Sequence, residues 1–451
     1  MNCGLPAVLA ALSGQPIEVH EHVLTPPPEL RAPTPAPPAE GKTVYGSNFE
    51  HHVDGQNFTV QWSGSEGDEA SALAALSALE IAWTELVELE GWPQPVSSDT
   101  YFLWVLLDRG LAGTTGYTTV YTTPDYPDGY PVTYLNPDYA WDDAFWTSLA
   151  AHEFGHALQY RLRAASTGGD EESWYWEASA EWMAETAVPT ADAYAYQSLY
   201  YCDNPAYRYS SMTDLHQYGM LVLNAWLEEH GPGPGSLQDV WRLGESRVGE
   251  TWEGILADST GLDVSTIWGG FTGHLANGSL RESALYFEPD QRGELEQGAS
   301  GSLAYLGSDF WIATSEVAVS SSDRVALGGP DGWAETVTVA PGEVLTVTGL
   351  GDPVTDYTLE LGPPSQPDDT AAPGDTDGPP ADTEAPRDTA SDPGDDGRPG
   401  SDATETWQLC GCNGAATGAW WLLGLVPLAR RRRLREPARL RSTPSRPPAS
   451  G

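Results

Sequence analysis

Residues 142–163 read Asp142-Asp-Ala-Phe-Trp-Thr-Ser-Leu-Ala-Ala-His-Glu-Phe-Gly-His-Ala-Leu-Gln-Tyr-Arg-Leu-Arg163. The apolar side chains recur at helical spacing after Asp142 or Asp143, so this stretch predicts a capped helix. His152 and His156 lie on one face of that helix, where both imidazoles can reach a single metal ion. Glu153 follows the first histidine, and its carboxylate can act on a water beside the metal. The stretch therefore predicts a zinc-binding helix.

A catalytic zinc site needs a third protein ligand and one open position. Residues 176–182, Trp-Glu-Ala-Ser-Ala-Glu-Trp, belong to a second predicted helix that begins at the acidic turn 170–172 and ends before Pro189. The chain travels about 10 Å beyond His156 and returns about 7 Å on the next helix, so Glu177 comes level with the histidines. Glu181, one turn later, is placed to accept a hydrogen bond from a ligand imidazole. Two alternatives stay open: Glu181 as the ligand, or the glutamates of this helix as a solvated acidic face.

The two quoted stretches resemble the gluzincin metallopeptidases, in which an HExxH helix is followed by a glutamate ligand on the next helix. They are similar to the collagenase-like branch and to secreted metalloproteases of myxobacteria and related bacteria. The resemblance covers about residues 45–361 and implies a zincin-like fold, with the two histidines and Glu177 as zinc ligands and Glu153 as general base. Collagenase-like sequences usually have glycine after the ligand glutamate, whereas this chain has Ala178. That small change leaves the ligand assignment standing.

Zinc peptidase sites usually add a second hydrogen-bond donor for the developing oxyanion. The candidates are Tyr218 and His216, in the predicted helix 214–230. The alternatives are a core aromatic residue for Tyr218 and a surface histidine for His216. The predicted strand Val132–Leu135, just before the zinc helix, is expected at the edge of its sheet, where an extended peptide could add as a further strand.

The patterns along the whole chain predict an α+β fold. A mixed sheet with the zinc helices forms a catalytic domain at 43–285, and short β-branched runs form a small all-β, sandwich-like domain at 286–362. Further predicted elements are strands at 57–62, 100–107, 117–121, 310–314, 317–319, 335–339, 344–347 and 357–361, and helices at 68–90, 237–247 and 251–257.

Composition excludes one class of function. The 451 residues include 18 Trp, 20 Tyr and 8 Phe, which is enough for a packed core. Basic residues number 21 against 65 acidic ones, for a net charge of -44, and the only lysine is Lys42. Nucleic-acid binding requires clustered Lys and Arg. The folded part is therefore not expected to bind nucleic acid.

Both ends of the chain carry targeting patterns. Residues 1–42 combine an apolar start, interpreted as a signal or leader or else an ordinary terminus, with a proline-rich linker. Residues 363–406 are rich in Asp, Pro and Thr and predict a disordered acidic stalk. Residues 407–451 contain Cys410-Gly-Cys412, an apolar run and Arg430-Arg-Arg-Arg433.

This last order resembles the tripartite C-terminal sorting tags of myxobacterial surface proteins, the MYXO-CTERM type. Such tags end just after the arginines, whereas this chain continues to Gly451. The resemblance implies a bacterial protein that is secreted or anchored at the cell surface (outer membrane). The alternative is a basic disordered tail.

Taken together, the sequence predicts a zinc-dependent endopeptidase with one catalytic Zn²⁺. Its substrates would be proteins or peptides outside the cell. The alternative from another class is a non-catalytic surface adhesin whose zinc helix pair is structural or inert. A third hypothesis is a self-processing protein whose only substrate is its own chain.

Overall fold

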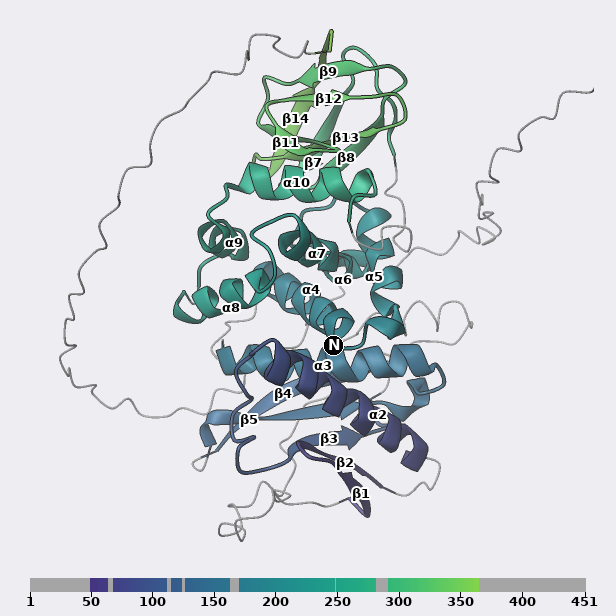
Figure 1. The fold of residues 1–451 in the computed structure, drawn as a ribbon, viewed down its shortest axis with the longest axis vertical. Helices are drawn as coiled ribbons and strands as arrows, with labels where there is room; N and C mark the ends of the chain where they lie inside the picture. Colours follow the sequence, from purple (N-terminus) through teal and green to yellow (C-terminus); the bar gives the residue numbers. More distant parts are fainter. Residues whose placement is uncertain are drawn as a thin grey trace, which may run out of the picture. The chain divides into compact units, whose positions relative to one another are not determined.

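A computed structural model describes residues 49–63, 68–111, 115–123, 126–162, 170–247, 249–280 and 291–364. The expected leader, stalk and sorting tag lie outside the described residues. Helices and strands are mixed in the chain, so the α+β class is confirmed (Figure 1). The division into domains at 43–285 and 286–362 stays a prediction.

Five strands near the N-terminus form a mixed sheet in the order β1-β2-β3-β5-β4. The three central strands are parallel, and an antiparallel strand lies at each edge. The expectation that Val132–Leu135 is an edge strand is wrong, because β4 folds back on β5 as a hairpin and becomes the edge itself. The strands are β1 (His51–Asp54), β2 (Phe58–Trp62), β3 (Leu103–Leu107), β4 (Gly116–Thr123) and β5 (Tyr126–Leu135).

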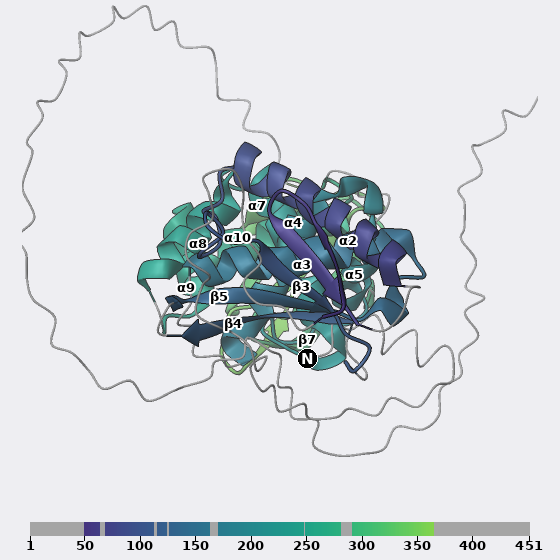
Figure 2. The same ribbon diagram turned by 90° about the horizontal axis from the view of Figure 1, so that it is seen from below.

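The strands β2 and β3 of this sheet are buried on both faces. Side chains of β3 alternate between two apolar clusters, with Val105 in the larger one and Trp104 and Leu106 in the smaller. Helices pack on the face of the larger cluster, where Figures 1 and 2 show α2 and α3 side by side. Phe154 of α3 meets Phe58 of β2 edge to face at 5.1 Å. The helices on this face are α2 (Asp68–Ala82), the π-helix η1 (Trp83–Leu89) and α3 (Asp143–Leu162).

Residues 68–89 form one continuous helix that is long and apolar enough to cross a membrane. Its buried side chains, among them Ala72, Leu79 and Leu86, belong to the core that it shares with α3. We therefore interpret it as a core helix. The sequence predicts this helix, although its last turns widen from α to π geometry.

Helix α3 is the predicted zinc helix, and the next long helix, α4 (Asp170–Ala187), packs against it. Asp142 caps α3 as predicted, because its carboxylate accepts a hydrogen bond of 2.9 Å from Phe145 N. Gly155 allows a close approach between the helices, since a Cβ at this position would lie 3.2 Å from Met183 Sδ and 3.4 Å from Ala180 Cα. The 3₁₀ turn η2 (Pro137–Tyr139) precedes α3, and η3 (Pro189–Ala191) follows α4.

Shorter helices follow α4 and enclose it from the other side (Figure 1). The predicted helix 214–230 begins only at His216, because Asp214 and Leu215 have left-handed φ angles of 51° and 67° that a right-handed helix cannot include, and it is divided again at Met220. The helices that follow η3 are α5 (Ala193–Cys202), η4 (Thr213–Leu215), α6 (His216–Gly219), α7 (Leu221–Glu229), α8 (Ser236–Ser246), α9 (Trp252–Thr260) and α10 (Val264–Ala276).

The C-terminal strands form a β-rich module with sheets in the orders β11-β10-β13-β8-β6, β12-β9-β15 and β14-β7. Helix α10 packs on the first of these, and Gly273 allows contact with the backbone of Gly329. The predicted strand 357–361 is divided between two strands of different sheets. The strands are β6 (Gly293–Glu294), β7 (Ser300–Ala304), β8 (Ser308–Ile312), β9 (Val317–Ser320), β10 (Val325–Gly329), β11 (Gly332–Ala334), β12 (Thr336–Val339), β13 (Val344–Gly349), β14 (Val354–Thr358) and β15 (Glu360–Gly362).

Candidate metal centre

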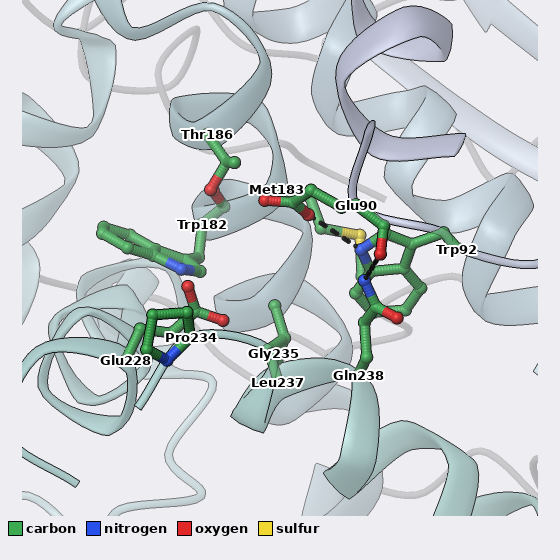
Figure 3. A pocket seen from close by; sticks show the side chains of 10 residues that line it. All are labelled: Glu90, Trp92, Trp182, Met183, Thr186, Glu228, Pro234, Gly235, Leu237 and Gln238. Carbon is green, nitrogen blue, oxygen red and sulfur yellow. Dashed lines mark hydrogen bonds between the residues drawn. The ribbon is translucent and has the colours of Figure 1, made fainter. Parts of the chain in front are cut away.

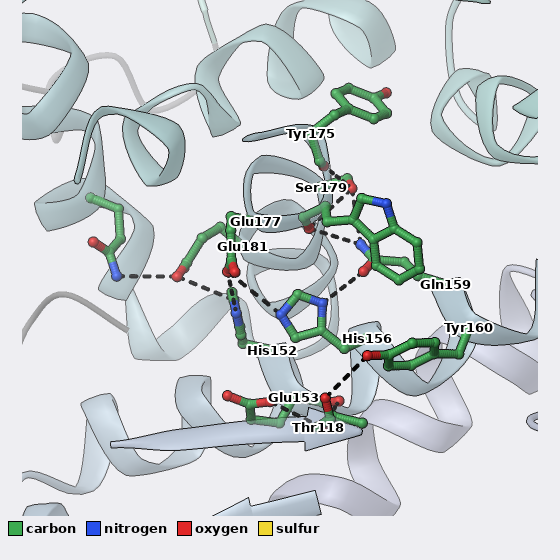
Figure 4. A network of polar contacts seen from close by, with 12 residues as sticks. Thr118, His152, Glu153, His156, Gln159, Tyr160, Tyr175, Glu177, Ser179 and Glu181 are labelled. Atoms are coloured by element: carbon green, nitrogen blue, oxygen red, sulfur yellow. Dashed lines mark hydrogen bonds and ion pairs between the residues drawn. The ribbon is translucent and has the colours of Figure 1, made fainter. Parts of the chain in front are cut away.

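Helices α3 and α4 bring the predicted ligands together (Figure 4). His152 and His156 project from one face of α3, and Glu177 projects toward them from α4. The Oε2 atom of Glu177 lies 3.3 Å from His152 Nε2 and 3.5 Å from His156 Nε2. All three side chains are buried, and their donor atoms lie within 4.8 Å of one another. This group, found among the described residues, could hold a metal ion.

The spacing of the donor atoms fits a tetrahedral divalent cation. Zinc binds histidine nitrogen and carboxylate oxygen at about 2.0–2.2 Å, which places two ligands of a tetrahedron about 3.3–3.5 Å apart. The two nitrogen-to-oxygen distances, 3.3 and 3.5 Å, match this spacing. Burial raises the pKa of the Glu177 carboxyl, but the two neighbouring imidazoles lower it further, so the pKa lies below its ordinary value. Two imidazoles and one ionised carboxylate are a suitable donor set for zinc.

Each imidazole is held through its other ring nitrogen. His152 Nδ1 lies 3.2 Å from Glu181 Oε1, the contact that the helix spacing predicts. His156 Nδ1 lies 2.7 Å from Gln159 Oε1. These contacts orient both rings so that their Nε2 atoms face Glu177. Glu177, and not Glu181, is therefore the carboxylate that the two Nε2 atoms share.

Two glutamines that the sequence analysis does not single out also support this arrangement. Gln159 lies three residues after His156 on the same helix, and its amide donates to Trp176 O at 2.9 Å. Gln197 of α5 donates to Glu181 Oε1 at 3.2 Å. The first could have been found from its i+3 spacing, whereas the second depends on the packing of α5 against α4.

We expect the change Gln159→Leu to weaken the binding of a metal ion, tested with Zn²⁺, by about 10- to 100-fold, because His156 loses the group that fixes its ring orientation. Leucine has nearly the same size and cannot accept the hydrogen bond. Competition with a chromogenic chelator would measure the affinity. The control is Arg161→Leu, an exposed position on the same helix. Equal zinc affinity in both variants would contradict a positioning role for the glutamine.

Glu153 lies on α3 against the edge strand β4. Its side chain is fully buried, and Oε2 accepts a hydrogen bond of 3.0 Å from Thr118 Oγ1. Gly116 of β4 makes room for the carboxylate, since a Cβ there would lie 3.1 Å from Glu153 Oε1 and 3.0 Å from Tyr134 O. Burial raises the pKa of Glu153 above its ordinary value, although the two imidazoles lower it. The sequence singles out Glu153 but not Thr118, because strand pairing alone decides which residue of β4 reaches α3.

The structure separates the two candidate oxyanion donors. Tyr218 of α6 is buried, and its ring centroid lies 6.1 Å from that of His152. His216 is fully buried, so the surface interpretation is wrong, and its ring centroid lies 5.5 Å from that of Tyr201 and 5.9 Å from that of Tyr207. Burial lowers the pKa of His216 to about 3, which makes it neutral at ordinary pH. Tyr218 is therefore the better placed of the two.

A cavity of about 290 Å³ lies beside α4, and none of the candidate metal ligands is among its lining residues (Figure 3). Its walls include Trp182, Met183 and Trp92, and two carboxylates, Glu90 and Glu228, contribute to the lining. Glu90 is exposed as a residue, but desolvation of its carboxyl and repulsion from Glu228 raise its pKa to about 7, against a lowering effect of the Trp92 indole. Glu90 therefore begins to take up a proton near neutral pH.

We expect Glu90→Gln to stabilise the protein at pH 8 by about 1 kcal/mol more than at pH 5. The pKa of Glu90 rises from 4.5 to about 7 on folding, so stability is highest below 4.5 and falls as the pH rises through 7. Glutamine has no ionisable group, so the variant does not lose this stability as the pH rises. Urea unfolding at both pH values measures the difference, with Glu88→Gln, a glutamate of η1 that is not among the lining residues of the cavity, as control. An equal pH effect in the two variants would rule the explanation out.

Comparison with known proteins gives one family. A model described as a family of unknown function (DUF6055) matches residues 49–251. The matched segment begins before β1 and ends after α8, so it includes all the candidate metal ligands and excludes the β-rich module. No curated protein sequence matches the chain.

Proposed function

We propose that this protein is a zinc-dependent endopeptidase that hydrolyses peptide bonds of proteins outside the cell. The observation that carries the proposal is the approach of Glu177 Oε2 to both histidine Nε2 atoms, at 3.3 and 3.5 Å. The buried carboxylate of Glu153 lies on the same helix as the histidines. The arrangement supports the resemblance to gluzincins, and it supports a zincin-like fold for the sheet and its helices.

The chain's own residues would divide the chemistry among them. A zinc ion held by three protein ligands acidifies a water and polarises a carbonyl group. Glu153 would accept the proton of the attacking water and deliver it to the leaving amine, a role suited to a carboxylate with a raised pKa. Tyr218 would donate a hydrogen bond to the developing oxyanion. Glu181 and Gln159 would hold the ligand imidazoles in orientation.

The substrate would bind along β4 rather than along β5. Within the described sheet β4 pairs only with β5 and is therefore its edge strand, although residues 116–119 of β4 are buried. Thr118 of this strand contacts Glu153 directly. An extended polypeptide added to this edge would therefore pass beside the proposed catalytic base. Backbone pairing of this kind favours polypeptide substrates of varied sequence.

The proposed location outside the cell depends on the termini. The acidic stalk and the Cys-Gly-Cys, apolar and arginine segments support export and anchoring at a bacterial surface. Fractionation of producing cells, followed by detection of the folded part, tests this. Recovery of all the protein from the cytoplasm would contradict it.

The test of the activity uses the full chain. Metal analysis should find about one zinc per chain, and labelled casein or gelatin should be cleaved. Glu153→Gln should retain the zinc and lose at least about 10²-fold in rate, as expected for removal of a general base. Zinc without cleavage of any protein would favour the adhesin hypothesis. Trimming of the chain's own termini alone, abolished by the same change, would indicate self-processing.

A further inference from the structure

The turn between β7 and β8 (Tyr305–Gly307) lies against a loop of the helical region, residues 203–212. Ser308 N donates to Pro205 O at 2.7 Å, and Tyr209 N donates to Tyr305 O at 3.4 Å. A Cβ on Gly307 would lie only 2.4 Å from Ala206 O. The turn and the loop are therefore in direct backbone contact.

Side chains strengthen this contact. Arg208 of the loop forms an ion pair of 2.9 Å with Asp352 of the β-rich module. The guanidinium carbon of Arg208 also lies 5.5 Å from the ring centroid of Tyr305. Tyr209 packs against Tyr305 edge to face at 5.7 Å. Hydrogen bonds, an ion pair and ring contacts thus join the loop to one turn of the module.

The same loop continues to the proposed active site. Tyr207 donates a hydrogen bond of 3.0 Å to Asp214, and its ring lies 5.9 Å from the ring of His216. Asp214 and Leu215 are left-handed, a conformation that persists in such residues only when surrounding contacts hold it. Tyr218 follows within the short helix α6, with its ring 6.1 Å from that of His152.

We propose that the β7–β8 turn is a positioning element of the proposed active site. By holding the loop 203–212, the turn maintains the left-handed bend at Asp214 and Leu215, and this bend sets where Tyr218 stands relative to His152. Only the expected change in kcat depends on the proposed peptidase function; the positioning of Tyr218 by the turn does not. The β-rich module, which lies outside the segment matched by the family model, is then part of the catalytic unit and not an appended binding module.

The main test is Gly307→Ala in the full-length chain, because the added methyl group displaces the loop at Ala206. We expect kcat on labelled casein to fall about 10-fold or more, while zinc affinity stays within about 2-fold, since the ligands lie on α3 and α4. Arg208→Ala, which removes the ion pair without adding bulk, should lower kcat in the same direction by a smaller factor. This second variant keeps the test decisive if Gly307→Ala does not fold.

The matched control is Gly342→Ala, in the turn between β12 and β13. Gly342 has a φ of 90°, so the change strains the module without touching the loop. Amide hydrogen exchange of residues 213–218 should rise in Gly307→Ala and Arg208→Ala but not in Gly342→Ala. This readout needs no enzymatic activity. Unchanged exchange in the first two variants, or an equal rise in the control, would overturn the inference, whereas an inactive wild type would contradict the peptidase function alone.

Discussion

Glu177→Ala is expected to weaken zinc binding by about 10²- to 10³-fold. Zinc binding to protein sites contributes roughly 10–16 kcal/mol in total, so one of four ligands accounts for about 3–4 kcal/mol. Glu177 contributes the carboxylate oxygen that lies 3.3 and 3.5 Å from the two imidazole nitrogens. Isothermal titration of the metal-free protein with zinc, in the presence of a competing chelator, measures the loss.

Glu181→Ala is the matched control for this change. Glu181 lies one turn further along α4 and contacts His152 through Nδ1, on the side of the ring away from Glu177. Its removal should cost only about 10- to 100-fold in zinc affinity, as is typical of a group that orients a ligand. A larger loss for Glu181→Ala than for Glu177→Ala would exchange their roles and contradict the ligand assignment.

Between pH 7.5 and 5, the His216→Phe variant is expected to lose about 2 kcal/mol less free energy of unfolding than the wild type. The pKa of His216 is about 3 in the folded protein against 6.5 in the unfolded chain. Below pH 6.5 the unfolded chain takes up a proton that the folded protein does not, so each pH unit costs about 1.4 kcal/mol. The groups that face the ring are Tyr201 from α5 and Tyr207, which in turn contacts Asp214.

Urea unfolding of the metal-free protein at pH 7.5 and 5 measures this effect. Metal-free protein is required because zinc release at low pH would add a second pH dependence. Phenylalanine can keep ring contacts with the same two tyrosines and has no ionisable group. His52→Gln on the exposed strand β1 is the control for the loss of one histidine. If the wild type and His216→Phe lose the same stability on acidification, the buried histidine is not the cause.

Local patterns were sufficient to predict much of the fold. The strand at Leu103–Leu107 and the helices α3 and α4 follow from apolar runs, helical spacing and the cap at Asp142. The break at Leu215 could not be predicted, because leucine is a good helix former and only tertiary contacts hold it in a left-handed conformation. Likewise, the position of β5 inside its sheet depends on how the β4–β5 hairpin folds back, and it cannot be predicted from the residues of β5 alone.

In the candidate site, too, some residues could be predicted from the sequence and others could not. The histidine pair and Glu177 could be predicted because helix geometry fixes their spacing within each helix and a short connection fixes the pairing of the helices. Thr118 and Gln197 could not, because they reach Glu153 and Glu181 from a strand and a helix whose placement is a property of the whole fold. Sequence therefore predicts the ligands better than it predicts the residues that hold them.

The π-helix η1 marks a place where the chain can change its length by one residue. The amide of Glu90 bonds to Glu85 O, five residues back, so this stretch contains more residues per turn than an α-helix. The seven residues of η1 therefore turn through nearly the same angle as about six residues of an α-helix, at about 100° each. Deleting one of them would let the helix continue as α while Glu90 and Trp92 keep their places in the lining of the cavity beside α4. Related chains can therefore differ by one residue within Trp83–Leu89 without a change in the orientation of the residues that follow.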